Sequence, residues 1–383
     1  MPPFLLYNIT NFEVCGDFLQ HSKNFIVNEG IQLRLYIISA IVAALLLIVT
    51  ISNRFDVWNT KDLAYDDEQV GLDDQIVINF SHVVAENTPK GLAANKFAEV
   101  VKEKSNGKIL VQIYPNGILY NDENELAALK KGDIQMIAPS ISKMTKTLPS
   151  WQVLDLPFIF ENDEQVYEIL HGEVSESLLQ ELESINIHGL TFWHNGFKQM
   201  ASNSTPLLDV DQFKDLTIRI MPSDILKEQF LLLEAKPILK TFNDLYAAIQ
   251  NNEIIAQENT LSNLYSKGYY SMQPNITLSN HGILAYSVLM NEDFWTSLTG
   301  EQKRIIQDSL DEMQRWQHDQ AVAINAQNFK QLEQVEEIEF YEISEKRRDQ
   351  WMEALQPIYD SYEKLSNKDF LTQLRKEIQE TNN

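Results

Sequence analysis

The fold is decided by the stretch from Ile76 to Tyr114, which reads IVINFSHVVAENTPKGLAANKFAEVVKEKSNGKILVQIY. It opens with a short apolar, β-branched run at 76–80 and closes with a second at 109–114, and both predict strands. Between them, Thr88-Pro89 indicates a helix start because proline suits the first helical turn, and apolar residues then follow at helical spacing. The stretch therefore predicts a strand–helix–strand unit.

The same alternation continues beyond this stretch, with a helix predicted at 123–131 and a third strand at 134–138. Strands and helices that alternate at this pitch predict an α/β lobe with a parallel sheet. Ligands bind such sheets at the carboxyl ends of the strands. His82, the turn that carries Lys90, and Ser140 all follow predicted strand ends, so we expect them near a binding site.

A second α/β lobe is predicted downstream, with the chain crossing between lobes at about Asn195 and again near Leu284. We assign residues 74–195 and 285–324 to lobe I, and residues 196–284 and 325–383, with the C-terminal helices, to lobe II. The elements expected after residue 160 are strands at 189–194, 197–203, 216–221, 254–257 and 281–291, and helices at 164–183, 224–233, 242–250 and 301–335.

Composition excludes several classes of function. The 383 residues include 55 acidic and 31 basic side chains, a formal charge of −24, which argues against nucleic acid or an anionic membrane surface as a partner. Cysteine occurs once, at Cys15, so no intrachain disulfide can form. The sequence contains no HExxH, GxSxG or phosphate-binding glycine loop, and we predict neither an enzyme nor a metal or cofactor site.

The N-terminal part is expected to stand apart from the two lobes. After a segment at 1–34, residues 35–53 read LYIISAIVAALLLIVTISN without a charge. As a helix this run spans roughly 28 Å, the thickness of a bilayer's hydrocarbon core. It is either an uncleaved transmembrane anchor or a long signal-peptide core, and residues 54–73 read as an acidic tether.

One arginine stands out in the predicted strand at 216–221. Side chains alternate between the two faces of a strand, so Ile218 and Ile220 can face a core while Arg219 and Met221 face the other way. A guanidinium among apolar neighbours needs an anion, and a carboxylate bound by two parallel hydrogen bonds is the natural one. That carboxylate belongs either to the protein itself or to a ligand.

Seven segments in one order resemble a known family. They are SHVVAENTPKG (81–91), GKILVQIYPNGILYND (107–122), ELAALKKGDIQMIAPS (125–140), LDLPFIF (154–160), WHNGFKQMASN (193–203), LTIRIMPS (216–223) and QENTLSN (257–263). From residue 76 onward the chain looks like the solute-binding subunit of tripartite ATP-independent periplasmic (TRAP) transporters, and most like its C4-dicarboxylate-binding branch.

The resemblance implies a two-lobed clamshell with hinge strands and a long bracing helix, in the periplasm. Its ligand would be a small organic acid anion such as malate, succinate or fumarate, and its partners the TRAP membrane subunits, with the N-terminal helix as an anchor in the inner membrane. By resemblance, Arg219 grips the substrate carboxylate, Asn259 is the asparagine of the QEN segment, Phe242 lines the pocket, and Ser140 comes from the APS segment.

Two further cations are candidates for a second carboxylate. Lys198 stands where many relatives carry arginine, and Lys90 follows a turn; each could act as a point charge, or simply be solvated. His82 could donate to a carboxylate or be structural. The sequence departs from the family in reading IAQENT at 255–260 rather than DGQENP, which affects the placement of Asn259. A membrane-anchored sensor that signals to a kinase remains the alternative function.

Overall fold

The computed structural model describes residues 41–44, 75–365 and 368–381. The chain divides into one unit at Met1–Asp73 and a compact unit at Asp74–Asn383, which contains both β-sheets. The predicted acidic tether and most of the apolar segment lie outside the described residues. Among the described helices, none has the length and apolar character needed to cross a membrane.

The first sheet contains five strands in the order β2-β1-β3-β10-β4. Its strands β1, β2 and β3 are parallel, as the sequence predicts, whereas β10 is antiparallel to both of its neighbours. The parallel pairing predicted for the first three strands is therefore confirmed, and β10 is antiparallel because the chain returns from the second sheet in the opposite direction. The strands are β1 (Ile76–Ser81), β2 (Ile109–Tyr114), β3 (Met136–Ile137), β4 (Ile187–Phe197) and β10 (Ile283–Asn291).

Helices beside this sheet begin and end where the local sequence predicts. Helix α2 (Pro89–Lys104) starts with proline, and the Thr88 side chain accepts a hydrogen bond from the Gly91 amide. Helix α3 (Glu125–Lys131) ends at Gly132, which adopts the left-handed conformation typical of a helix C-terminus. The start of α2 places Lys90 in the first turn, directly beside the carboxyl ends of the strands.

The second sheet contains six strands in the order β11-β9-β5-β8-β6-β7. Three of them, β7, β9 and β11, were not predicted, because apolar and polar residues alternate only weakly along them. The strands are β5 (Gln199–Ser202), β6 (Thr217–Ile220), β7 (Lys236–Leu239), β8 (Ala256–Asn259), β9 (Asn275–Leu278) and β11 (Glu339–Glu342), and the helices that accompany them are α7 (Asp224–Leu232), α8 (Leu245–Gln250) and α9 (Leu261–Ser266).

Two glycines account for differences from the predicted elements. Strand β4 does not stop at Asn195-Gly196 but continues to Phe197, with a register shift opposite β10. Gly196 makes this continuation possible through its φ of 121°. The single helix expected at 164–183 is instead two, α5 (Asp163–Leu170) and α6 (Glu173–Glu181), interrupted at Gly172.

A long helix joins the two halves, as predicted. Helix α11 (Gly300–Leu332) begins with a capping box formed by Thr299 and Gln302. Ile306 and Leu310 belong to the apolar core beside the first sheet, whereas Leu332 belongs to the core beside the second. The remaining helices are α4 (Ile141–Met144), α10 (Glu292–Ser297), α12 (Glu345–Leu355), α13 (Pro357–Leu365) and α14 (Lys368–Thr381).

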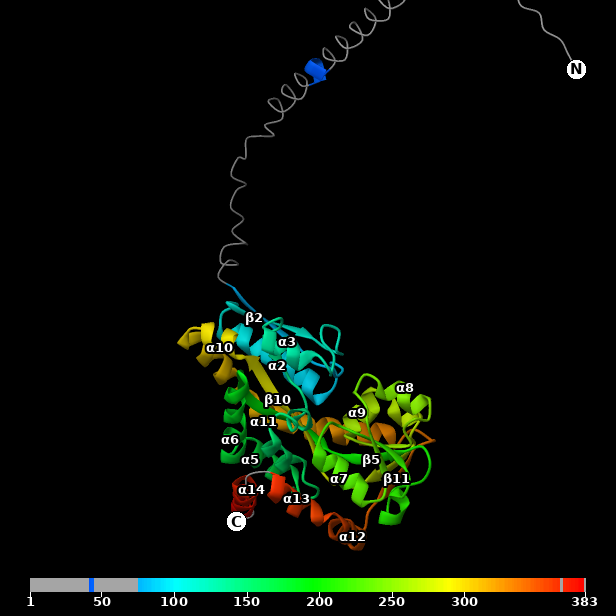
Figure 1. Ribbon diagram of the computed structural model, residues 1–383. Coiled ribbons are helices and arrows are strands. Elements are labelled where there is room, and N and C mark those ends of the chain that lie inside the picture. Colours follow the sequence, from blue (N-terminus) through cyan, green and yellow to red (C-terminus); the bar gives the residue numbers. More distant parts are fainter. Residues whose placement is uncertain (1–40, 45–74, 366–367, 382–383) are drawn as a thin grey trace, which may run out of the picture. The chain divides into compact units, whose positions relative to one another are not determined.

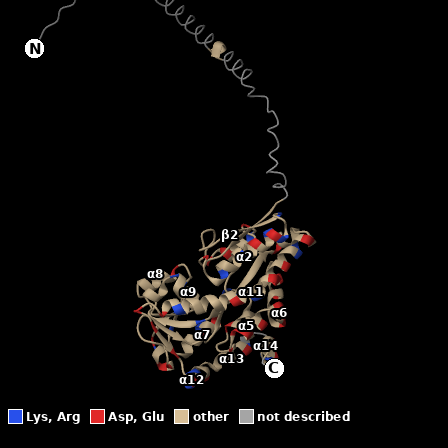
Figure 2. Cartoon of the chain, turned by 180° about the vertical axis from the view of Figure 1, so that it is seen from behind, with Lys and Arg blue, Asp and Glu red and all other residues tan. Residues whose placement is uncertain are grey.

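The arrangement is a two-sheet α/β fold of the expected class. Figure 1 shows α2, α3 and β2 gathered in one part of the molecule and α8, α9 and β5 in another. Acidic and basic residues are interspersed over the described chain (Figure 2), so the negative charge is not confined to one patch. The exact lobe boundaries drawn from the sequence stay a prediction.

Replacing Gly196 with alanine is expected to destabilise the protein. A Cβ at this position would lie 2.5 Å from Nδ2 of Asn325, and the φ of 121° is unfavourable for a side chain. We expect the free energy of unfolding to fall by about 2–4 kcal/mol in urea titrations. Gly107→Ala is the control, because its φ is also positive but nothing lies within 4 Å of the added carbon. Equal losses in both variants would contradict the proposed clash.

Candidate functional site

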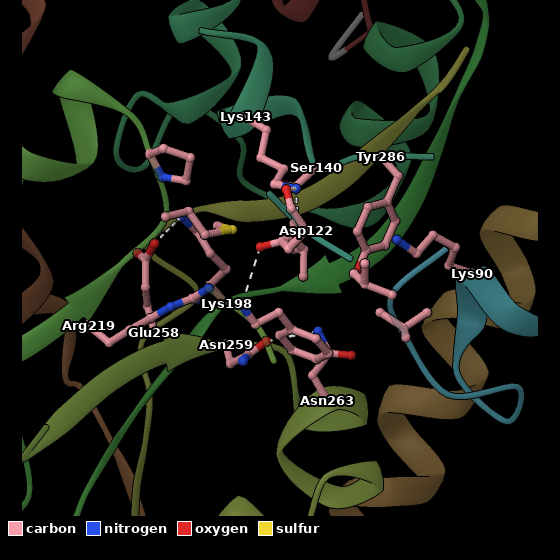
Figure 3. A pocket seen from close by; sticks show the side chains of 16 residues that line it. Lys90, Asp122, Ser140, Lys143, Lys198, Arg219, Glu258, Asn259, Asn263 and Tyr286 are labelled. Carbon is pink, nitrogen blue, oxygen red and sulfur yellow. Dashed lines mark hydrogen bonds and ion pairs between the residues drawn. The ribbon is translucent and has the colours of Figure 1, made fainter. Parts of the chain in front are cut away.

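A small cavity lies between elements of the two sheets. Side chains approach it from the turn before α2, from α4, from β6, β8 and β10, and from the loops that precede α3 and α8 (Figure 3). Its walls combine four cations, two acids and a set of apolar and neutral polar groups. The lining residues are Val83, Val84, Lys90, Asp122, Ser140, Lys143, Lys198, Arg219, Met221, Pro222, Phe242, Glu258, Asn259, Asn263, Leu284 and Tyr286.

Arg219 reaches the cavity from β6 with the strand alternation that the sequence predicts. Ile218 and Ile220 face the apolar core, whereas Arg219 and Met221 line the cavity. The arginine is only 3% exposed, and its Nε donates a hydrogen bond to the Lys240 carbonyl over 3.1 Å.

No acid of the described chain lies within ion-pair distance of the Arg219 guanidinium. Burial lowers the pKa of Arg219, and the more distant charge of Asp122 only partly opposes this effect. A buried cation without a counter-ion is costly, so this position favours an anion that the described chain does not supply.

Lys90 is a second cation without an acid partner among the described residues. It is fully buried, its Nζ donates to the Ala138 carbonyl over 2.8 Å, and the same nitrogen lies 3.6 Å from the centre of the Tyr286 ring. Burial lowers the pKa of Lys90 to about 7, although Glu125 and Asp122 act in the opposite direction. In Figure 3, Lys90 and Tyr286 lie on the other side of the cavity from Arg219.

Lys198, in contrast, already has a partner. Its Nζ lies 2.9 Å from Oε1 of Glu258, and Oε2 of Glu258 lies 2.9 Å from Nε2 of His281. Burial alone would raise the pKa of Glu258, but Lys198 and His281 more than offset it and lower that pKa to about 2. The carboxylate of Glu258 therefore stays ionised, and it neutralises Lys198 within the cavity wall.

A second ionic group connects the two sheets. Lys143 of α4 forms ion pairs with Asp122 and, over 3.0 Å, with Glu125. Asp122 also accepts a hydrogen bond from the Phe242 amide over 3.2 Å. Asp122 precedes α3 beside the first sheet, and Phe242 precedes α8 beside the second, so this bond spans the cavity.

Neutral polar groups complete the walls. Asn259 ends β8, and its Oδ1 accepts hydrogen bonds from Nδ2 of Asn263, over 2.9 Å, and from the Thr260 amide. The strand therefore holds Asn259 despite the missing glycine and proline of the usual family turn. Ser140 precedes α4 and forms a β-bridge with Tyr286, and burial raises the pKa of that tyrosine.

Six of the seven predicted site residues line this one cavity, namely Lys90, Ser140, Lys198, Arg219, Phe242 and Asn259. His82 does not. Its side chain is fully buried, and burial together with Lys90 lowers its pKa to about 3. The contribution of each residue to ligand binding stays a prediction.

Sequence reasoning missed Lys143, Asp122 and Glu258 among the residues that line the cavity. Glu258 carried a signal, because a carboxylate next to Asn259 in a buried strand requires a cationic partner. Asp122 and Lys143 carried none, since acids and lysines outside strands are usually solvated.

Known proteins resemble this chain over most of its length. The family described as "Bacterial extracellular solute-binding protein, family 7" matches residues 80–365. The C4-dicarboxylate-binding protein DctB of Bacillus subtilis is 43% identical over 314 residues, which cover 82% of this chain and 90% of that protein. The C4-dicarboxylate-binding periplasmic protein DctP of Shewanella loihica is 38% identical and covers 77% of this chain and 87% of its own.

Solved structures agree with this similarity. A TRAP periplasmic solute-binding protein of Shewanella oneidensis with bound succinate superposes with a TM-score of 0.76 at 37% identity, over 79% of this chain and 99% of that chain. A TRAP periplasmic solute-binding protein of Pseudomonas aeruginosa with bound L-malate gives a TM-score of 0.73 at 33% identity, over 75% and 100%. The chain therefore belongs to bacterial extracellular solute-binding protein family 7, the solute-binding proteins of TRAP transporters.

Proposed function

We propose that this protein captures a C4-dicarboxylate of the malate, succinate or fumarate type and delivers it to TRAP membrane subunits, without carrying out chemistry on it. The proposal depends on one observation about Arg219. Its guanidinium is buried beside the cavity, and no acid of the described chain lies within ion-pair distance of it. Its planar fork of donors suits one carboxylate.

Lys90 accounts for the second carboxylate. It approaches from the first sheet, whereas Arg219 approaches from the second, and each lacks an acid partner in the described part of the chain. A dianion between them would compensate both charges and link the two sheets. Exclusion of water around the closed site strengthens each charged contact.

The relatives support this class of ligand. Two of them are named for C4-dicarboxylate binding, and the two solved structures contain succinate and L-malate. Membership of the transporter family favours transport over the alternative of a sensor. We place the protein outside the cytoplasmic membrane, in the periplasm, where the apolar segment at 35–53 would either anchor it or act as an export signal.

Calorimetry with a panel of acids tests the proposal. We expect the full-length protein to bind at least one of succinate, L-malate and fumarate, with an affinity at least about 100-fold higher than for propionate, which leaves one of the two cations without a partner. Methyl succinate monoester is the matched control, because it keeps the carbon chain and removes one charge. Equal affinity for the monoanions and the dianions would contradict the assignment of two anion-binding cations.

A further inference from the structure

We propose that binding of the dicarboxylate is coupled to the uptake of one proton, and that the proton is taken up by Lys90. The inference rests on the proposed function, because it concerns the same cavity. Lys90 is then protonated when the ligand is bound and mostly neutral at alkaline pH when it is not, so the affinity for the ligand depends on pH.

The surroundings of Lys90 are unusual for a charged amine. The side chain is fully buried, and among the described residues its only hydrogen bond is the one from Nζ to the Ala138 carbonyl. Lys90 is the second residue of α2, where the helix dipole is positive and disfavours a cation. The Tyr286 ring and that single carbonyl compensate only part of the lost hydration.

The balance of charges around the cavity also favours a protonated Lys90 when a dianion is bound. Four cations line it, and in the described chain three carboxylates line it or pair with its lining. Lys198 is matched by Glu258, and Lys143 is shared between Asp122 and Glu125, which leaves Lys90 and Arg219 to meet the two charges of a ligand. With a neutral Lys90 the occupied site would hold one more uncompensated negative charge than with a charged Lys90, which is costly in a buried cavity.

Several titratable groups lie near Lys90, and burial raises the pKa of one of them, Glu125. Glu125 of α3 and Asp122 before it favour its charged form, whereas Lys143 of α4 disfavours it. His82 after β1 and Tyr286 of β10 are kept neutral by burial, which lowers the pKa of the histidine and raises that of the phenol. With the cavity empty, burial dominates and lowers the pKa of Lys90 to about 7.

A bound carboxylate raises the pKa of Lys90, because an opposite charge favours the protonated amine. Ligand binding and proton binding therefore favour each other. Above pH 7 the empty protein has mostly lost this proton and must regain it on binding, whereas below pH 7 the proton is already present. Proton uptake therefore increases with pH, and affinity falls as the pH rises above about 7.

Isothermal titration calorimetry measures this uptake directly. The full-length protein is titrated with L-malate in buffers of different ionisation enthalpy, at several values between about pH 6 and pH 8.5, where both malate carboxyls are ionised. The slope of binding enthalpy against buffer ionisation enthalpy gives the number of protons. We expect the uptake to be small at pH 6 and to approach one proton at pH 8 and above.

The pH profile separates Lys90 from other acceptors. Uptake by His82, whose pKa is lowered by burial, would be largest at acid pH and would fall as the pH rises, which is opposite to the trend expected for Lys90. His82→Asn is a control that should keep the uptake. Lys90→Met should bind more weakly and take up no proton at pH 8. Uptake that persists in Lys90→Met would overturn the inference.

Nuclear magnetic resonance measures the protonation of Lys90 directly in the unmodified sequence. In protein labelled with ¹³C at lysine Cε, the Lys90 signal should be displaced by the Tyr286 ring, which lies 3.6 Å from Nζ. We expect it to titrate near pH 7 in the empty protein and not below about pH 9 with malate bound. Malate binding without any change in this titration would refute proton coupling and leave the proposed function intact, whereas failure of every dicarboxylate to bind would refute the proposed function.

Discussion

Arg219→Ala is expected to lower the affinity for a C4-dicarboxylate at least about 100-fold, and Arg219→Lys at least about tenfold. The alanine variant loses the only described cation of β6 in the cavity, and it leaves one ligand carboxylate buried without a partner, at a cost of about 3 kcal/mol or more. Lysine keeps the charge but loses the planar pair of donors. Calorimetry with succinate or L-malate measures both effects.

The control for these variants is Arg347→Lys. Arg347 forms an ion pair with Asp209 over 2.8 Å, lies outside the cavity and is partly exposed. It should bind the ligand with unchanged affinity, since exposed pairs of this kind contribute little. The thermal midpoint of empty Arg219→Ala should not decrease, because in the described structure this arginine has no acid to leave unpaired. Unchanged affinity in Arg219→Ala would refute the anion-binding role.

Glu258→Gln is expected to cause the largest loss of stability, about 3–5 kcal/mol in the free energy of unfolding. The substitution keeps the size of the side chain but removes the charge that holds Lys198 and His281. Lys198 would then be a buried cation without a counter-ion. Urea unfolding of the ligand-free protein measures the loss.

A double-mutant cycle provides the control. Lys198→Met combined with Glu258→Gln removes both charges, so the double variant should lose clearly less than the sum of the two single losses. Additive losses would show that the pair does not interact. The pH dependence gives a second check. The pKa of Glu258 is about 2 when folded and higher when unfolded, so its contribution is complete above the unfolded value and is lost as the pH falls toward 2.

Local sequence patterns predicted where several helices begin and end. Thr88-Pro89 marked the start of α2, Gly132 marked the end of α3, and the helix predicted at 301–335 corresponds to α11 at Gly300–Leu332. These features depend on the chemistry of a few neighbouring residues, such as a capping hydroxyl or a glycine that tolerates positive φ. A sequence read by itself contains that information.

Features that depend on distant contacts were not predictable in the same way. The antiparallel direction of β10 depends on where the chain returns from the second sheet, which no local pattern encodes. Alternation in β6 correctly placed Arg219 opposite the core, yet the pairing of Lys198 with Glu258 joins residues that lie 60 positions apart. His82 followed a strand end as expected, but a side chain can turn into the core from that position.

The position of β10 constrains how the protein is made. This strand fills the place between β3 and β4, so the first sheet stays incomplete until Asn291 has been synthesised, long after β1 to β4 have left the ribosome. Strand pairings of such wide sequence separation form slowly, because the intervening loop must be closed first. A nascent chain with this topology is therefore expected to complete its first sheet only after nearly all of the second sheet has been synthesised.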